Sequence, residues 1–134
     1  MPIHRIPATL LASLFLSLSL PAVAKTINVP AQQPTIQAGI TAASNGDTVL
    51  VAAGTYYESI NFNGKAITVT SASGPGATVI DGSKTGNTAT VTFNSGETLS
   101  SVISGFTVEN QSSGGINVYA RRRRFRAIFS PRIL

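Results

Sequence analysis

The sequence predicts an all-β fold, a solenoid of about three stacked coils of parallel strands that begins with a short capping helix. Three observations lead to this prediction. After residue 47 the chain consists of short β-branched runs separated by Gly, Asn, Ser and Pro. A single amphipathic helical segment precedes these runs, and no second one interrupts them. The runs also recur at a nearly constant spacing, which is typical of a solenoid.

Two interleaved series of runs carry this repeat. Their central residues are Ile60, Val79 and Val102 in the first series, and Val49, Ile67, Val91 and Ile116 in the second. The steps are 19 and 23 residues in the first series and 18, 24 and 25 in the second. Two series with one common period indicate coils that each carry at least two strands. Stacked parallel strands lie ~4.8 Å apart, so the β-branched side chains would line the interior, with Gly and Asn at the corners.

The capping helix is expected over residues 35–44. Ile36, Ile40 and Ala43 follow one another at i, i+4 and i+7, which places them on one helical face. Thr35 is a suitable N-cap and Gly46 a suitable stop. Such a helix would cover the open first coil and protect its edge from pairing with other chains.

An antiparallel sandwich is the alternative all-β architecture. Residues 62–66, FNGKA, contain an Asn-Gly pair that is typical of a two-residue hairpin turn. Repetition in register favours the solenoid, because a sandwich does not require it.

The first 24 residues have the order of a secretory signal peptide. A short basic start is followed by an apolar run, a proline and the small-x-small sequence Ala22-Val23-Ala24, which places the cleavage before Lys25. A membrane anchor is the alternative, but the apolar run is shorter than the ~20 residues of a spanning helix. We therefore expect a secreted protein, located outside the cell, in a periplasm or at the cell surface, with no membrane span after cleavage.

Charge and composition exclude several classes of function. The chain has no cysteine and a single histidine, His4, so disulfides, thiolate metal sites and His-based triads or zinc sites in the mature chain are excluded. Residues 25–120 carry three lysines against five acidic residues, whereas six of the ten basic residues follow Ala120. The basic character therefore belongs to residues 121–134 alone.

Three explanations of this arginine-rich end were compared. A nucleic-acid arm conflicts with secretion and with the acidic body, so no nucleic-acid partner is expected. A disordered, solvated tail is a second explanation. The third is that residues 121–134 are an out-of-frame end, because a shifted reading frame permits a further strand-like repeat. This third hypothesis accounts for the abrupt change in composition at Ala120.

Residues 35–62, 66–83 and 102–110 resemble the first coils of right-handed parallel β-helix proteins of the pectin-lyase-like class. The likeness covers residues 26–119 and implies that the chain is the N-terminal part of such a right-handed β-helix. Residues 54–58, GTYYE, are similar to the Gly-x-Tyr-x-Glu segment near the start of pectin esterases, which de-esterify plant cell-wall pectin. Those enzymes carry their catalytic residues on later coils, and this chain has no matching segment. The same motif also occurs in β-helix proteins of unknown activity.

No catalytic residue, metal ligand or cofactor is expected. The predicted register stacks Asp81 on Ser104, so Asp81 lacks the second carboxylate that polysaccharide hydrolysis needs. Its DGS sequence is also that of an ordinary turn. Lyase chemistry would need acidic ligands for calcium and a basic residue. Lys25, Lys65 and Lys84 are expected instead to be solvated lysines in loops or at the starts of strands.

Tyr56, Tyr57 and Glu58 form the candidate substrate-binding cluster. Aromatic rings can stack on sugar rings while a carboxylate accepts hydrogen bonds from their hydroxyl groups, so extracellular polysaccharide is the expected partner. The alternative is that one tyrosine packs under the capping helix.

The expected function is that of a secreted β-helix fragment related to polysaccharide-active or polysaccharide-binding proteins, without catalytic activity as written. The alternatives are a truncated pectin esterase or polysaccharide lyase and a structural surface β-helix. The sequence leaves the oligomeric state open.

Overall fold

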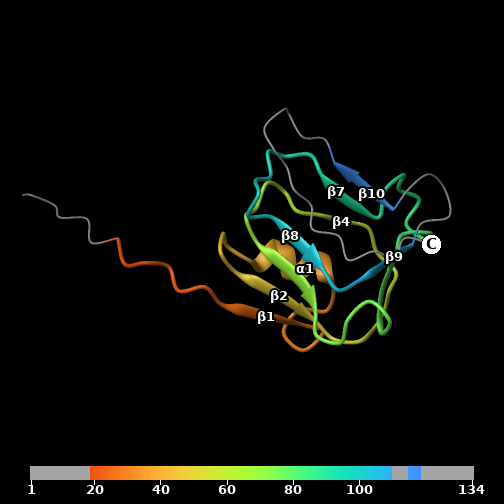
Figure 1. Cartoon of the computed structure of the whole chain (residues 1–134), viewed down its shortest axis with the longest axis horizontal. Helices are drawn as coiled ribbons and strands as arrows, with labels where there is room; N and C mark the ends of the chain where they lie inside the picture. Colours follow the sequence, from red (N-terminus) through yellow and green to blue (C-terminus); the bar gives the residue numbers. More distant parts are fainter. Residues whose placement is uncertain (1–18, 110–114, 119–134) are drawn as a thin grey trace, which may run out of the picture.

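The computed structural model describes residues 19–109 and 115–118 (Figure 1). This part of the chain contains one helix, α1 (Ile36–Ala42), and ten short strands. The strands are β1 (Thr26–Val29), β2 (Thr48–Val51), β3 (Gly54–Tyr56), β4 (Ile60–Asn61), β5 (Thr68–Ser71), β6 (Thr78–Asp81), β7 (Val91–Phe93), β8 (Val102–Ser104), β9 (Thr107–Glu109) and β10 (Ile116–Val118). The predicted signal peptide covers residues 1–24, of which the structure describes 19–24, and the arginine-rich end at residues 121–134 lies outside the described residues.

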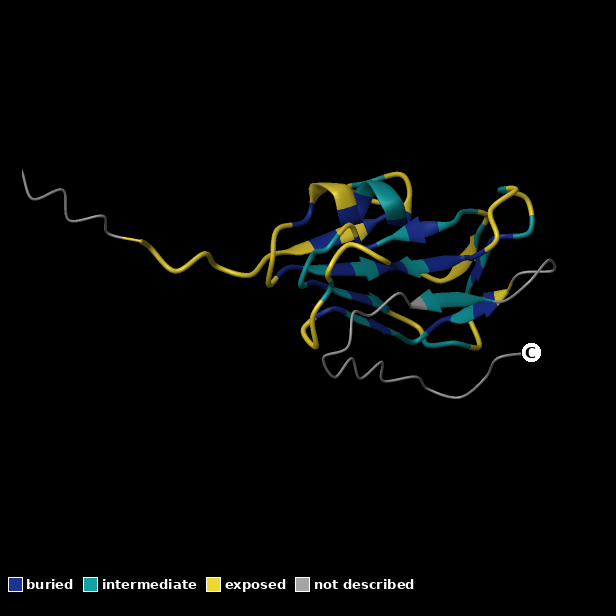
Figure 2. Ribbon diagram, turned by 90° about the horizontal axis from the view of Figure 1, so that it is seen from above, coloured by how far each residue is buried: buried dark blue, intermediate teal, exposed yellow. Residues whose placement is uncertain are grey.

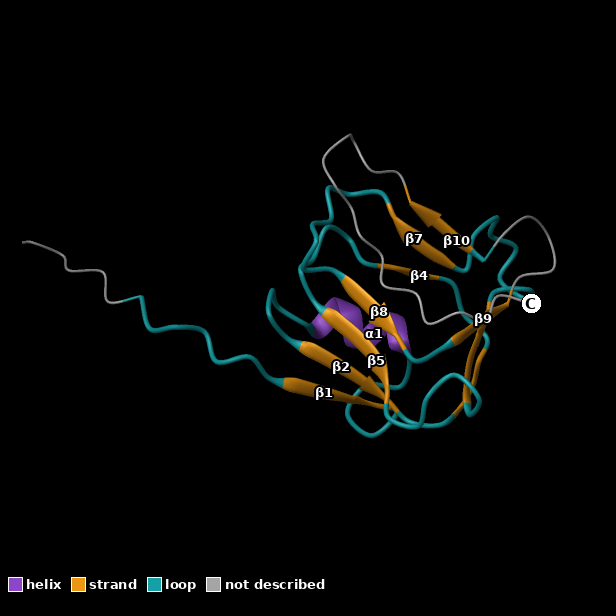
Figure 3. Ribbon diagram, in the orientation of Figure 1, coloured by secondary structure: helices purple, strands orange, loops and turns teal. Residues whose placement is uncertain are grey.

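The strands form three parallel sheets (Figure 3). Sheet A has the order β1-β2-β5-β8, sheet B has β3-β6-β9, and sheet C has β4-β7-β10. Every strand pair is parallel, which confirms the all-β solenoid and excludes the antiparallel sandwich. Each full coil contributes one strand to each sheet, in the order A, B, C.

The solenoid has about four turns, compared with the expected three or so. The additional turn is the first one, in which β1 supplies the strand of sheet A and α1 takes the place of the other two strands. The helix contacts β1, β2 and β4, and Figure 2 shows it at one end of the stack of strands. This arrangement confirms the predicted capping helix.

The predicted register of the coils is correct for Val91 and Ile116, which pair as expected, and wrong for the other alignments. Ile60, Val79 and Val102, which were aligned as one series, belong to sheets C, B and A respectively. Val49 pairs with Val69 rather than with Ile67. The physical reason is that coil length varies, since Thr48 pairs with Thr68 but Thr68 pairs with Val102. Alternating β-branched runs look alike in all three sheets, so their pattern cannot tell one sheet from another.

The core lies between the three sheets and is filled by alternate residues of each strand (Figure 2). The Phe62 and Phe93 rings stack in its centre, with their centroids 4.4 Å apart and their planes at 30°. The largest fully buried side chains come from all three sheets and from the helix: Phe62, Phe93, Ile36, Ile40, Ile60, Ile67, Ile80, Val29, Val49, Val51, Val69 and Val91.

Helix α1 begins as the sequence predicts, because the Thr35 hydroxyl accepts a hydrogen bond from the Ala38 N–H at 3.1 Å. It ends at Ala42, with Ala43 as the C-cap. Gly39 lies against β2, where an added Cβ would come within 2.8 Å of Val49 Cγ1. The helix is thus packed closely against sheet A.

The segment FNGKA forms a corner of the solenoid and not a hairpin. Asn63 and Gly64 have φ angles of 54° and 73°, and the Lys65 N–H donates to the Phe62 carbonyl at 3.1 Å. The turn connects β4 in sheet C to β5 in sheet A. The two strands on either side of the Asn-Gly pair therefore belong to different sheets and do not pair with each other.

Candidate functional site

Tyr56 of the predicted binding cluster packs against the core. It is the last residue of β3, its ring is partly buried, and its hydroxyl donates to the Ala52 carbonyl at 3.0 Å. Burial raises the pKa of Tyr56, and the charge of Glu58 adds to the effect. The contacts of this tyrosine are therefore those of a structural residue.

Glu58 binds the N-terminus of α1. Its two carboxylate oxygens accept hydrogen bonds from the Ile36 N–H at 3.0 Å and the Gln37 N–H at 2.9 Å. The first N–H groups of a helix have no partner within the helix, and a negative charge there is favourable. Together with the Thr35 cap on Ala38, the carboxylate satisfies the first turn of α1. Both oxygens of Glu58 are thus engaged by the protein.

Tyr57 is the exposed member of the predicted cluster, with 54% of its surface accessible. The ammonium group of Lys84 lies 3.8 Å from the centroid of its ring, a cation–π contact. The three predicted residues therefore point to different neighbours: Tyr56 to the core, Glu58 to the helix and Tyr57 to the surface. The structure does not bring their functional groups together.

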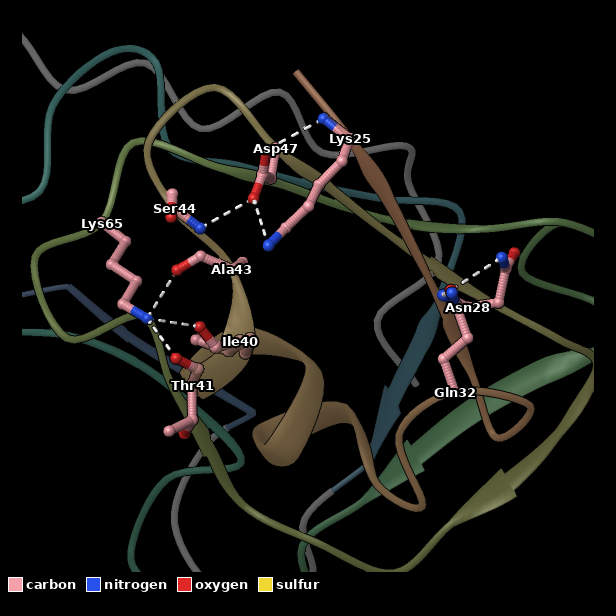
Figure 4. Close-up of polar contacts among 9 residues, drawn as sticks. All are labelled: Lys25, Asn28, Gln32, Ile40, Thr41, Ala43, Ser44, Asp47 and Lys65. Atoms are coloured by element: carbon pink, nitrogen blue, oxygen red, sulfur yellow. Dashed lines mark hydrogen bonds and ion pairs between the residues drawn. The ribbon is translucent and has the colours of Figure 1, made fainter. Parts of the chain in front are cut away.

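Lys65 is not the solvated loop lysine that the sequence predicts. Its ammonium group donates to the carbonyls of Ile40 (2.7 Å), Thr41 (2.7 Å) and Ala43 (2.8 Å) at the end of α1 (Figure 4). The last carbonyls of a helix lack partners within the helix and attract a positive charge. Glu58 and Lys65 flank β4 in the sequence, so the segment that carries this strand holds both ends of the helix.

The side chain of Gln37 binds the backbone of β4, the edge strand of sheet C next to α1. Its Nε2 donates to the Asn61 carbonyl at 3.2 Å, and its Oε1 accepts from the Asn61 N–H at 2.7 Å. One carboxamide thus forms both hydrogen bonds that a neighbouring strand would make with this residue. Sequence reasoning missed this contact, because its two residues are 24 positions apart.

A groove of about 340 Å³ lies on the outer face of sheet C. Asn61, Thr92 and Asn117 occupy successive strands in register and form a polar row across the sheet. The lining residues come from β4, β7, β10 and the loops beside them: Ser59, Ile60, Asn61, Asn87, Thr88, Ala89, Thr92, Asn94 and Asn117. Sequence reasoning did not single out this row, although the repeated pattern of outward Asn and Thr in three runs could have indicated it.

Hydrogen bonds within the protein orient part of the groove. The Asn61 amide donates to the Asn94 side-chain oxygen at 3.1 Å and accepts from the Asn63 N–H at 2.8 Å. Among the described residues, the side chains of Asn87 and Thr92 make no hydrogen bond to the protein. The groove therefore offers both fixed and available polar groups.

A hydrogen bond joins Ser59, which lines the groove, to the loop that carries Lys84 and Thr85. The hydroxyls of Ser59 and Thr85 lie 2.7 Å apart. Tyr57 precedes Ser59 by two residues and Lys84 precedes Thr85 directly, so the Tyr57–Lys84 pair lies next to this hydrogen bond. The groove and Tyr57 together form the candidate site.

The expected isolation of Asp81 is wrong, because it pairs in register with Glu109 and not with Ser104. Its carboxylate accepts hydrogen bonds from Ser83, which lower its pKa, and the charge of Lys84 contributes in the same direction. A general acid needs a raised pKa so that it carries a proton near neutral pH. The lowered pKa favours the ionised form of Asp81, which is the form suited to a base or nucleophile and not to a general acid.

The described residues contain no group of three or more metal-ligating side chains that could hold an ion. Across residues 19–109 and 115–118, no helix has the length and apolar character to cross a membrane.

The chain was compared with protein-family models, with curated proteins and with solved structures, and it matches none of them. Its assignment is therefore that of a parallel β-solenoid with a capping helix.

Proposed function

We propose that the protein is a secreted polysaccharide-binding module, a right-handed β-helix related to the pectin-lyase-like class. The observation that carries the proposal is the polar groove on sheet C; the exposed Tyr57 precedes Ser59 of its lining by two residues in the chain. Amides and hydroxyls both donate and accept hydrogen bonds, as sugar hydroxyls do, and an aromatic ring provides an apolar surface for a sugar ring. Residues 25–134 would then act outside the cytoplasm, after cleavage before Lys25.

We propose that the groove binds the polysaccharide and does not catalyse its cleavage. Among the described residues, the lining of the groove contains no carboxylate, lysine, arginine or histidine. Acid–base and nucleophilic catalysis both require titratable or activated groups at the reacting bond. We therefore expect no release of methanol or unsaturated sugars when the protein is incubated with pectin.

An enzyme is the second candidate, as the N-terminal part of a pectin esterase or lyase. The observation that favours it is the pair of carboxylates, Asp81 and Glu109, on adjacent strands of sheet B. Release of either product from pectin, and its loss in Glu109→Gln, would establish this candidate in place of the first.

Retention on insoluble polysaccharides tests the binding proposal. Thr92→Val and Asn87→Ala each remove a polar group of the groove that has no partner in the described protein. A hydrogen bond contributes about 1 kcal/mol, so each change should weaken retention roughly 2- to 10-fold. Tyr57→Ala should weaken it as well, through the loss of stacking.

Thr55→Val is the matched control for Thr92→Val. Thr55 lies on β3 in sheet B, is exposed, and is not among the residues that line the groove. Its replacement should leave retention unchanged. Equal retention of the wild type, the groove variants and the control would show that the groove is not the binding site, and no retention of the wild type on any polysaccharide would favour the structural β-helix.

A further inference from the structure

The lining of the groove is neutral as well as polar. Seven of its nine residues are Asn, Ser or Thr, and the other two, Ile60 and Ala89, are apolar. Lys84, whose ammonium lies over the Tyr57 ring, is not part of this lining. A ligand in the groove therefore meets donors and acceptors, and no compensating charge among the described lining residues.

Neutral lining discriminates between two chemical classes of polysaccharide. A polyuronate carries a carboxylate on each sugar, which accepts hydrogen bonds but donates none. Placing such a charge in a groove without a cation removes water from it with no ion pair in return, and this is unfavourable. The hydroxyls of an uncharged sugar lose little free energy when water is removed, because amide and hydroxyl side chains can donate and accept the hydrogen bonds that water made.

On the basis of the proposed function, we infer that the sheet C groove selects uncharged glycan chains over polyuronates. Homogalacturonan provides a matched pair of probes, since its fully methyl-esterified and its de-esterified forms differ in charge on the same backbone. The wild type should bind the esterified form, with roughly tenfold weaker binding of the de-esterified form.

The six arginines of residues 121–134 could attract any polyanion, so the experiment has to separate their effect from that of the groove. Measurement in about 1 M salt shortens the Debye length to about 3 Å and suppresses this attraction. Thr92→Lys then introduces one cation into the groove while the arginines stay the same. The variant should lose affinity for the esterified form and gain roughly 2- to 5-fold for the de-esterified form. Asn87→Lys introduces the same charge at an exposed loop position of the groove, where the change should not affect folding.

The possible outcomes separate this inference from the proposed function. Preferential binding of the de-esterified form by the wild type in high salt, weakened by Thr92→Val, would overturn the inference and leave the function intact. Binding of neither form, nor of any other uncharged polysaccharide, would overturn both.

A second, independent observation concerns the start of the mature chain. Asp47 is buried, with 5% of its side chain exposed, and it accepts hydrogen bonds from the backbone N–H groups of Lys25 (3.0 Å) and Ser44 (2.8 Å). The Lys25 ammonium lies 3.7 Å from the same carboxylate (Figure 4). Residues 19–24, directly before Lys25, run away from the body as an exposed segment (Figure 1).

The atom that donates to Asp47 is the nitrogen that cleavage before Lys25 would turn into the new N-terminus. Hydrolysis of the Ala24–Lys25 peptide bond by water leaves a carboxylate on Ala24 and an amine on Lys25, which is protonated at neutral pH. A charge-assisted hydrogen bond is roughly twice as strong as a neutral one. We propose that removal of the leader stabilises the solenoid, because the new ammonium group binds the buried carboxylate of Asp47.

Three forms of the protein test this proposal: the chain beginning at Lys25, the same chain acetylated at its N-terminus, and the chain that retains Ala24. The first should have a Tm roughly 4–8 °C above the other two, which keep a neutral N–H at this position. The difference should disappear in Asp47→Asn. Equal Tm values for the three forms, or a difference that persists in Asp47→Asn, would refute it.

Discussion

At the residue scale, a few charged side chains of the second coil determine whether α1 forms. A helix of seven residues is too short to be stable alone, since its first and last peptide groups lack partners. Glu58 supplies acceptors at one end and Lys65 supplies donors at the other. The GTYYE segment is thus explained structurally by its glutamate, which caps the helix, and by its first tyrosine, which packs on the core.

Lys65→Met should destabilise the protein by about 1–3 kcal/mol. The change retains most of the aliphatic chain but leaves three carbonyls at the end of α1 without their charged donor. Urea denaturation gives the free energy of unfolding of both proteins. Lys84→Met is the control, because this lysine is exposed and lies over the exposed Tyr57 ring, so its removal should change stability by less than about 0.5 kcal/mol. Equal effects of the two changes would mean that the helix does not depend on Lys65.

Asp47 should make stability depend on acid pH. Hydrogen bonds from the backbone N–H groups of Lys25 and Ser44 lower the pKa of Asp47 below its ordinary value. A carboxyl whose pKa is lowered in the folded state stabilises the fold above its unfolded pKa, and this contribution is lost as the pH falls through the folded pKa. The Tm of the wild type should exceed that of Asp47→Asn at neutral pH, and the difference should diminish as the pH falls below the unfolded pKa of about 3.9. A constant difference down to pH 2 or so would contradict this assignment.

At the element scale, the strands are short and the interior ladder of side chains holds them together. No described strand exceeds four residues, so each depends on side chains stacked in register above and below it. The ring stack of Phe62 and Phe93 joins two consecutive coils in this way, because the first follows β4 and the second ends β7.

Phe93→Ala should cost about 3–5 kcal/mol of folding free energy, because it leaves a cavity in the middle of the stack and removes the partner of Phe62. Leu99→Ala serves as the control, since Leu99 is exposed and its loss should be nearly neutral. Thermal or urea denaturation distinguishes the two. A small effect of Phe93→Ala would indicate that the coils unfold separately and do not share one core.

Two glycines at corners of the solenoid should differ in their response to alanine. Both have positive φ, 91° at Gly46 and 73° at Gly64, so alanine adds backbone strain of about 1–2 kcal/mol at either position. At Gly46 an added Cβ meets no atom within 4 Å, whereas at Gly64 it would lie 2.7 Å from the Ser95 carbonyl oxygen. Gly64→Ala should therefore destabilise the protein more than Gly46→Ala. Denaturation midpoints decide the order, and the reverse order would exclude close packing of the two coils at this corner.

At the scale of the whole molecule, the stack of coils has two unequal ends. Helix α1 and the side chain of Gln37 cover the first coil. Within the described residues, β8, β9 and β10 are the last strands of their sheets and have a neighbour on one side only. Stability in such a stack depends on neighbours and should therefore be greatest in the middle.

Amide hydrogen exchange should follow this order. The N–H groups of β2 and β5, which pair on both sides, should exchange more slowly than those of β8, which pairs with β5 alone in the described chain. Mass spectrometry of peptic fragments after exchange resolves these segments. Equal protection of β5 and β8 would indicate that β8 has a further partner.

The sequence by itself determined the kinds of element and the class of fold. Thr35 before the spaced apolar residues Ile36 and Ile40 specified a capped helix, and the β-branched runs specified strands that recur in a solenoid. These features depend on residues a few positions apart, where propensity and periodicity act directly. They were therefore readable without knowledge of the rest of the molecule.

Only the tertiary structure decided which strands are neighbours and what the polar residues do. One coil brings Thr48 beside Thr68 and the next brings Thr68 beside Val102, and this change of length cannot be inferred from runs that look alike. Three features depend on these coil lengths. They are the pairing of Asp81 with Glu109, the contacts of Glu58 and Lys65 with α1, and the row of Asn61, Thr92 and Asn117. Contacts between residues 20 or more positions apart are set by packing of the whole core, which local sequence patterns do not encode.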